Sequence, residues 1–193
     1  MTSVLENSLI ESESLIKALK DNQEFLSSFD KALKAMIETQ KTGNTIFSCG
    51  NGGSMADAIH FAEEMTGRFQ DNRRPLSAIA ISDPGYLSCV ANDYGYEHVY
   101  SRFIEGVGKK GDVILGISTS GNSKNVILAA KKAKKLGITS VGLLGKDGGE
   151  LKDLVDIPII VSSKITHRIQ EVHIKVIHSF IEGIEREITP ENY

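Results

Sequence analysis

The sequence contains no tryptophan, only two cysteines and only four prolines in 193 residues. Cys49 and Cys89 lack CxxC spacing, which argues against a redox motif or a zinc ribbon. Both stand in apolar surroundings, so we expect them to be buried and reduced, as in the cytoplasm. No apolar run approaches the roughly 20 residues of a membrane span, so we expect no membrane partner. The N-terminus lacks the basic start and apolar core of a signal peptide.

A strong excess of either charge is also missing. The 22 Lys and Arg residues nearly balance the 25 Asp and Glu residues, and the net charge of −3 argues against nucleic acid as a partner. One cationic run, KKAKK at 131–135, is most simply the solvated end of a helix, and a nucleic-acid patch is the less favoured interpretation. With 40% hydrophobic residues, the chain has the composition of one soluble globular domain.

From Thr45 onward, short apolar runs alternate with helical patterns. The expected strands are 45–49, 76–82, 112–117, 139–145 and 156–161. The expected helices are about 54–66, 84–91, 97–108, 123–136 and 167–187. Apolar strands separated by helices predict a parallel sheet with both faces covered. Two further amphipathic helices precede the first strand, and we expect part of this pair to form a subunit-packing surface. The alternative is a helical hairpin that simply lies on the domain.

A glycine-rich turn, GNGGS at 50–54, follows the first expected strand. Glycine lets the backbone approach a ligand closely, and a helix capped by Ser54 would point N–H groups and its dipole at an anion. The turn does not match a dinucleotide fingerprint, because the sixth position is Met55, and it lacks the Gly-Lys-Ser/Thr ending of a P-loop. Alone it is a weak signal for anion binding.

A second polar turn, STSGNS at 118–123, follows the strand 112–117 and precedes a helix. Its clustered hydroxyls, together with backbone N–H groups, can hold a phosphate without a cationic side chain. The competing interpretation is a helix cap with spare serines. A single serine is enough for capping, so phosphate binding is favoured.

Two helices carry polar side chains at spacings that allow a shared site. His60 and Glu64 are four residues apart and share a helix face. Gln170 and His178 are eight apart, a net rotation of roughly 80° and about 12 Å along the axis. His173 turns away and is most simply a hydrogen-bonded core residue. Two histidines, a carboxylate and an amide could bind zinc, although glutamine is an uncommon zinc ligand. No Ser-His-Asp order or reactive cysteine indicates covalent catalysis.

Six segments together resemble the bacterial phosphoheptose isomerases of the sugar-isomerase (SIS) group: SCGNGGS, HFAEEMTGR, AIAIS, ANDYG, GDVILGISTSGNS and RIQEVHIKVIH. The STSGNS turn is common to the wider SIS group, whereas HFAEE with RIQEVHIKVIH is much more specific. The resemblance implies a flavodoxin-like three-layer sandwich with a five-stranded parallel sheet. It also implies one SIS domain over 1–193, in which 1–42 is a helical extension, and a homotetramer with active sites between subunits.

The resemblance also implies the roles of particular residues. The zinc ligands, for one ion per subunit, would be His60, Glu64, Gln170 and His178. The residues that touch the substrate would be Asn51, Gly52, Gly53, Glu64, Arg68, Asn92, Asp93, Ser118, Thr119, Ser120, Ser123 and Gln170. Among them Ser118, Thr119, Ser120 and Ser123 would hold the phosphate.

The implied reaction is an aldose–ketose isomerisation of sedoheptulose 7-phosphate to D-glycero-D-manno-heptose 7-phosphate through an enediol. This would be the first step of nucleotide-activated heptose biosynthesis, for lipopolysaccharide or another glycan. We expect Glu64 to be the base and His178 the complementary acid/base. One rival is a non-catalytic SIS-fold protein that binds the bacterial replication initiator, but there we expect the two catalytic positions to be replaced. The other rival, a phosphosugar-binding regulatory domain, usually comes attached to a second unit.

Overall fold

The structure is a computed structural model that describes residues 3–190. Helices and strands alternate along most of the chain, as the hydrophobic pattern predicts. In chain order the elements are α1 (Val4–Lys20), α2 (Gln23–Lys41), β1 (Ile46–Gly50), α3 (Gly53–Thr66), β2 (Ala78–Ala80), α4 (Pro84–Tyr94), the 3-10 turn η1 (Tyr96–His98), α5 (Val99–Val107), β3 (Val113–Ser118), α6 (Lys124–Leu136), β4 (Thr139–Gly145), η2 (Glu150–Asp153), β5 (Ile157–Val161) and α7 (Thr166–Ile188).

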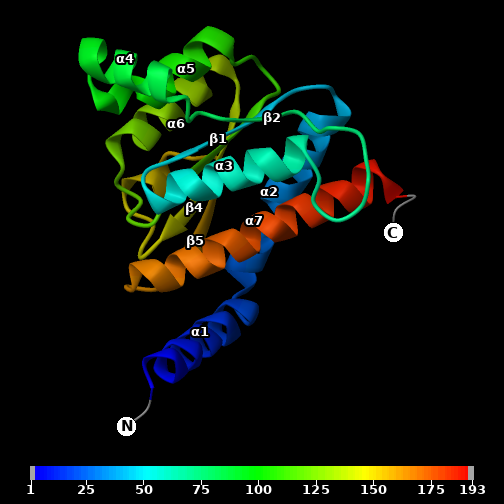
Figure 1. Ribbon diagram of the computed structural model, residues 1–193, viewed down its shortest axis with the longest axis vertical. Coiled ribbons are helices and arrows are strands. Elements are labelled where there is room, and N and C mark those ends of the chain that lie inside the picture. The colour runs from blue at the N-terminus through cyan, green and yellow to red at the C-terminus, as the bar shows by residue number, and fades with distance from the viewer. Residues whose placement is uncertain (1–2, 191–193) are drawn as a thin grey trace.

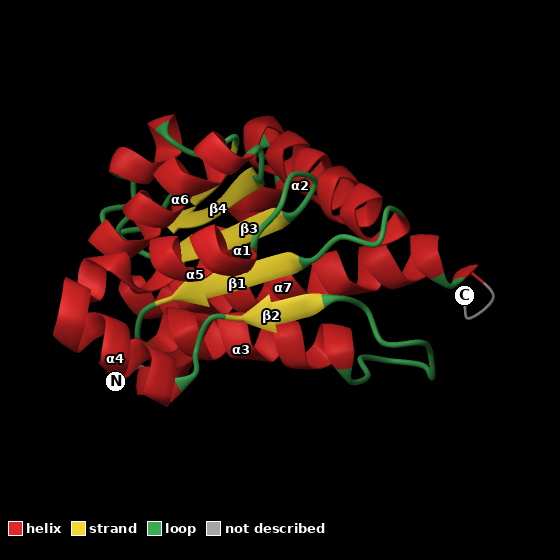
Figure 2. Cartoon of the chain, turned by 90° about the horizontal axis from the view of Figure 1, so that it is seen from above, coloured by secondary structure: helices red, strands yellow, loops and turns green. Residues whose placement is uncertain are grey.

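All five strands form one parallel sheet in the order β2-β1-β3-β4-β5. This order reverses direction between β1 and β3, the switch point at which open α/β sheets bind ligands beyond the carboxyl ends of their strands. Gly50 at the end of β1 pairs with Ile117 of β3, so the two polar turns that follow these strands start side by side. Figure 2 shows the strands lying between layers of helices.

The helices cover both faces of the sheet, because alternate strand residues point to opposite sides. On one face, Leu115 and Ile117 of β3 belong to a core that includes α2, α3 and α7. On the other face, Ile114 joins a core with α4, α5 and α6. The architecture is the expected three-layer α/β sandwich. Figure 1 shows α3 and α7 running side by side along the first of these faces.

Helix α1 projects away from the body of the domain (Figure 1). Among its residues Leu19 is buried, whereas several large apolar side chains are exposed, with fractions between 44% and 89%. The exposed ones are Val4, Leu5, Leu9, Ile10 and Ile16. Arg168 of α7 holds the helix through Ser8 and Ser12. In the described part of the chain, no helix is long and apolar enough to cross a lipid bilayer.

Three details differ from the sequence-based expectation. Gly52, not Ser54, is the N-cap of α3; its φ of 57° is accessible to glycine, and Ser54 lies buried inside the first turn. The second strand is shorter than 76–82, because this edge strand pairs with β1 over three residues. Cys89 is exposed on α4, whereas Cys49 is buried in β1 as expected, and burial raises the pKa of its thiol to about 12.

Candidate active site

One face of α3 carries several residues of the candidate site. Gly53, Asp57, His60 and Glu64 follow one another at intervals of four, three and four residues, so they form a stripe along the helix. The apolar residues on another face, including Ala58, Phe61 and Met65, anchor α3 to the sheet. Helical periodicity and the buried apolar face therefore fix the direction in which the stripe points.

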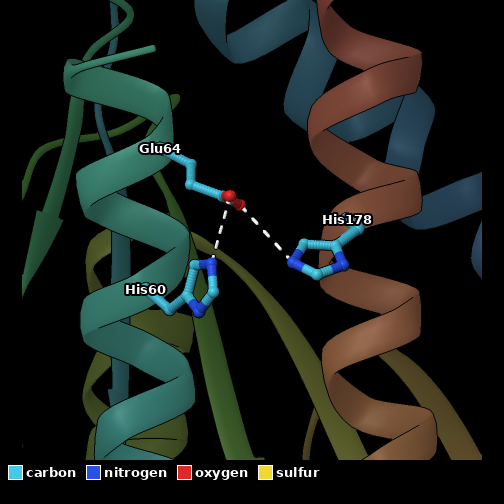
Figure 3. A group of neighbouring side chains, drawn as sticks. All are labelled: His60, Glu64 and His178. Atoms are coloured by element: carbon cyan, nitrogen blue, oxygen red, sulfur yellow. Dashed lines mark ion pairs between the residues drawn. The ribbon is translucent and has the colours of Figure 1, made fainter. Parts of the chain in front are cut away.

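The stripe meets α7 at His178. The Nε2 atom of His60 lies 3.1 Å from Oε1 of Glu64, and Nε2 of His178 lies 3.8 Å from Oε2 of the same carboxylate. Figure 3 shows the two imidazoles approaching Glu64 from different helices. The His60 and His178 side chains are each 42% exposed and that of Glu64 is 14% exposed. A partly buried carboxylate thus lies between two solvent-accessible imidazoles.

This His60–Glu64–His178 trio has the chemistry of a metal site. One ligand atom from each residue lies within 4.8 Å of the others. Two imidazole nitrogens and a carboxylate oxygen form a donor set that zinc takes in catalytic centres, which keep a position for substrate. Oε2 of Glu64 is buried and has no hydrogen-bond partner among the described residues. A buried carboxylate oxygen without a partner is costly unless a cation or a proton donor reaches it, so the residues fit a zinc ion.

Gln170 lies elsewhere along α7. A Cβ built on Gly53 would be 2.2 Å from Nε2 of Gln170, so this amide rests against the first turn of α3. It stands eight residues before His178, about 12 Å along the helix axis. Within one chain, the structure therefore brings His60, Glu64 and His178 together and places Gln170 beside the glycine turn.

The turn after β3 is tightly built. The Ser118 hydroxyl accepts a hydrogen bond from the Gly121 amide at 3.1 Å and shares another with the Ser123 hydroxyl at 3.0 Å. The Ser120 hydroxyl accepts from the Asn122 amide at 3.2 Å. Ser123 is the N-cap of α6, yet its side chain makes no capping hydrogen bond. Simple capping therefore does not account for its hydroxyl, and Thr119 and Ser120 are partly exposed beside it.

A pair of amides joins the turn after β1 to the first turn of α6. Asn51 Nδ2 donates to Asn125 Oδ1 at 2.9 Å, and Asn125 Nδ2 donates back to Asn51 Oδ1 at 2.8 Å. The Tyr96 hydroxyl also donates to Asn51 Oδ1, at 3.2 Å. The Asn51 side chain, which we expected to touch the substrate, is thus engaged inside the chain. The sequence did not identify Asn125 as a site residue, because an asparagine in the first turn of a helix has no distinctive pattern.

The remaining expected site residues lie at the surface. Arg68 follows α3 and donates to the Gln70 carbonyl at 3.1 Å. Asn92 and Asp93 lie near the end of α4 and hydrogen-bond to each other at 2.8 Å. All three are exposed. The structure therefore places them on the surface of the single chain, outside the trio of His60, Glu64 and His178.

Two residues near the trio were also missed. Asp57 lies one turn before His60, and its Oδ2 is buried without a hydrogen-bond partner in the described part of the chain. Burial raises the pKa of this carboxyl, and the charge of His60 acts in the opposite direction. The ring of Phe69 lies 5.7 Å from that of His178, centroid to centroid. The spacing of three residues from His60 could have revealed Asp57. Phe69 lies in the loop after α3, so no helical spacing relates it to His178.

His173 is fully buried, as the sequence indicated. Its Nε2 lies 3.2 Å from the Leu144 carbonyl oxygen, and its Nδ1 has no partner among the described residues. Desolvation lowers the pKa of this imidazole from 6.5 to about 4, although the contact with the Leu144 carbonyl acts in the opposite direction. At neutral pH the ring is uncharged, so Nε2–H donates to Leu144.

Comparison with known families gives one match, the SIS domain, over residues 10–145. Curated relatives extend along nearly the whole chain. The phosphoheptose isomerase of Fusobacterium nucleatum is 48% identical, with 93% of this chain and 97% of the relative covered. That of Cytophaga hutchinsonii is 49% identical over 96% of this chain and 98% of its own length.

Solved structures agree with these relatives. The phosphoheptose isomerase of Neisseria gonorrhoeae superimposes with a TM-score of 0.87 at 37% identity, covering 94% of this chain and 96% of the other. The enzyme from Francisella tularensis gives a TM-score of 0.90 at 28% identity with the same coverage. The likeness therefore includes the N-terminal helices as well as the sheet.

Proposed function

Because the chain belongs to the SIS domain family and, within it, to the phosphoheptose isomerases, we propose that it interconverts sedoheptulose 7-phosphate and D-glycero-D-manno-heptose 7-phosphate. The single observation that carries the proposal to particular atoms is the convergence of His60, Glu64 and His178 from two helices. The alternative of a non-catalytic initiator-binding protein is not favoured, since both expected catalytic side chains are present and the relatives are named as isomerases.

The carboxylate of Glu64 is suited to proton abstraction from carbon. Its Oε1 faces His60, whereas Oε2 is free of hydrogen bonds from the described residues and can take the C1 proton of the ketose. The electrons of the C–H bond then form the C1=C2 double bond of the enediol, and those of the carbonyl move onto O2. His178, 3.8 Å from Oε2, gives a proton to O2 and takes one from O1. Glu64 returns its proton to C2, which completes the aldose.

The trio would also hold the metal. A zinc ion bound by His60, Glu64 and His178 would polarise the substrate carbonyl as a Lewis acid. Glu64 and His178 then each serve two purposes. A zinc-bound imidazole nitrogen cannot also carry a proton, so we expect the coordination of both residues to be weak or shifting.

The turns beyond β1 and β3 would anchor the phosphate. Ser118, Thr119, Ser120 and Ser123 would supply hydroxyls at the switch point of the sheet, in a turn that starts beside the glycine turn after β1. This remote binding energy orients the open-chain sugar toward the carboxylate. Asn92, Asp93 and Arg68 would complete the sugar contacts, and Gln170 would contact both sugar and metal.

A homotetramer with shared sites is part of the proposal. Gln170 stands about 12 Å along α7 from His178, so a fourth ligand would come from the Gln170 of another copy. The apolar side chains exposed on α1 would supply a surface for such packing, which supports the proposal that the N-terminal helical extension takes part in assembly. Both cysteines are free thiols, in keeping with a cytoplasmic location.

The decisive experiment incubates the purified protein with sedoheptulose 7-phosphate, with and without a chelator, and identifies the product. We expect heptose 7-phosphate to form and chelation to slow its formation. The Glu64→Gln and His178→Ala variants should each lose at least about a hundredfold in kcat. Near-normal turnover by both variants would remove the assigned roles, and no product from the wild-type protein would remove the function.

A further inference from the structure

A buried arginine occupies the loop between α3 and β2. The Arg73 side chain is 0% exposed, and its guanidinium is engaged on every nitrogen. Nη2 donates to the carbonyl of Glu64, and Nη1 donates to that of Met65 at 2.9 Å. Nε makes an ion pair with Glu185 of α7, whose side chain is 2% exposed. One side chain therefore ties the end of α3 to α7 inside the protein.

These contacts lie on the same elements as the candidate catalytic pair. Arg73 holds the backbone of Glu64 itself, in the last turns of α3, where the carbonyls have no helical partners. Glu185 comes seven residues after His178, two helical turns further along the same face of α7. The loop that Arg73 anchors also carries Phe69, which packs against the ring of His178.

We propose that Arg73, through its pair with Glu185, is the positioning residue that sets the separation of Glu64 from His178. This inference rests on the proposed function, because it assigns a purpose to a contact that stands next to the reacting groups without touching them. The planar guanidinium is suited to this task, since it spans two backbone carbonyls and a carboxylate in one fixed fork. A lysine ammonium is a point charge and cannot hold all of them in one geometry.

Burial indicates a specific role for the pair. Surface ion pairs contribute little to stability, and a buried pair is often no better than apolar residues of similar volume. Stability alone therefore gives little reason to place charges here. The fork contributes instead a defined distance between two helices. Partners that hydrogen-bond directly to metal-ligating side chains change metal affinity by about 10–100-fold when they are lost. Arg73 holds the backbone of Glu64, so we expect its loss to act at the lower end of that range.

The test uses Arg73→Lys and Glu185→Gln, with Arg74→Lys as a matched control. Arg74 is the next residue in the same loop and is exposed. Zinc affinity of the metal-stripped full-length proteins is measured by competition with a chromogenic chelator, well below the melting temperature and after circular dichroism has shown intact folds. For sedoheptulose 7-phosphate, kcat and KM are measured separately.

We expect Arg73→Lys to weaken zinc binding about tenfold or more and to lower kcat similarly, with KM changed less than about threefold. Glu185→Gln, which keeps an acceptor oxygen, should give an intermediate loss, and Arg74→Lys none. Zinc affinity within about twofold of wild type in both variants would overturn the inference, whatever the melting temperature, and so would an equal loss in the control. If Arg73→Lys does not fold, the zinc affinity of Glu185→Gln alone tests the inference. A wild-type protein without isomerase activity refutes the proposed function. The zinc titration still tests whether the Arg73–Glu185 pair positions the metal-binding residues.

Discussion

The buried His173 should make the protein sensitive to acid in a defined pH range. Its pKa is lowered from 6.5 to about 4 in the folded chain, so the unfolded chain binds a proton more readily between these values. Stability follows the difference in bound protons, so it falls as the pH drops from about 6.5 to about 4. The full shift corresponds to about 3.5 kcal/mol, at ~1.4 kcal/mol per pKa unit. Between pH 7.5 and pH 5.0 the loss from this one group should be about 2 kcal/mol.

The variant that isolates this effect is His173→Gln. A glutamine amide can still donate to the Leu144 carbonyl but does not titrate, and the other ionisable groups remain in both proteins. Urea unfolding at pH 7.5 and 5.0, at one fixed protein concentration, gives the free energy of unfolding for each. We expect wild type to lose about 2 kcal/mol more than the variant on acidification.

The exposed His167, six residues earlier, provides the control. His167→Gln should keep the pH dependence of wild type, because no buried imidazole is removed. The reasoning is refuted if wild type and His173→Gln lose the same free energy within about 0.5 kcal/mol, since desolvation of the buried ring would then have no measurable cost.

Three further substitutions test the turns. Gly53→Ala places a Cβ 2.2 Å from the Gln170 amide, so the Gln170 side chain must shift. We expect an intact melting temperature and a kcat/KM lowered about tenfold. An unchanged kcat/KM would argue against Gln170 as a substrate contact. Gly121→Ala puts a Cβ 1.9 Å from the Gly148 carbonyl at φ +67°, and should cost about 3 kcal/mol or more in urea unfolding. Asn125→Ala leaves the Nδ2 donor of Asn51 without its acceptor. It should cost about 2 kcal/mol of stability and raise KM for the phosphosugar, which steady-state kinetics would detect.

Much of the fold could be predicted from local pattern. The apolar runs gave the five strands and the parallel sheet, because strands buried on both faces need apolar residues on both sides. Boundaries were less well determined, as β2 shows: an edge strand ends where its single neighbour stops pairing. The Ser54 cap was wrong because Gly52, with its positive φ, lets α3 begin earlier than the serine. Cys89 was wrongly placed in the core, because apolar neighbours in sequence do not decide which face of α4 is covered.

The sequence by itself determined that His60 and Glu64 share a helix face, since helical geometry is local and repeats every few residues. It could not determine which helix faces them. That His178 meets Glu64 while Gln170 rests on Gly53 follows from the alignment of α3 with α7 on the sheet. The contact of Arg73 with Glu185 joins residues 112 apart. Such pairs depend on how whole helices and loops pack against one another, so the spacing of residues within either segment does not predict them.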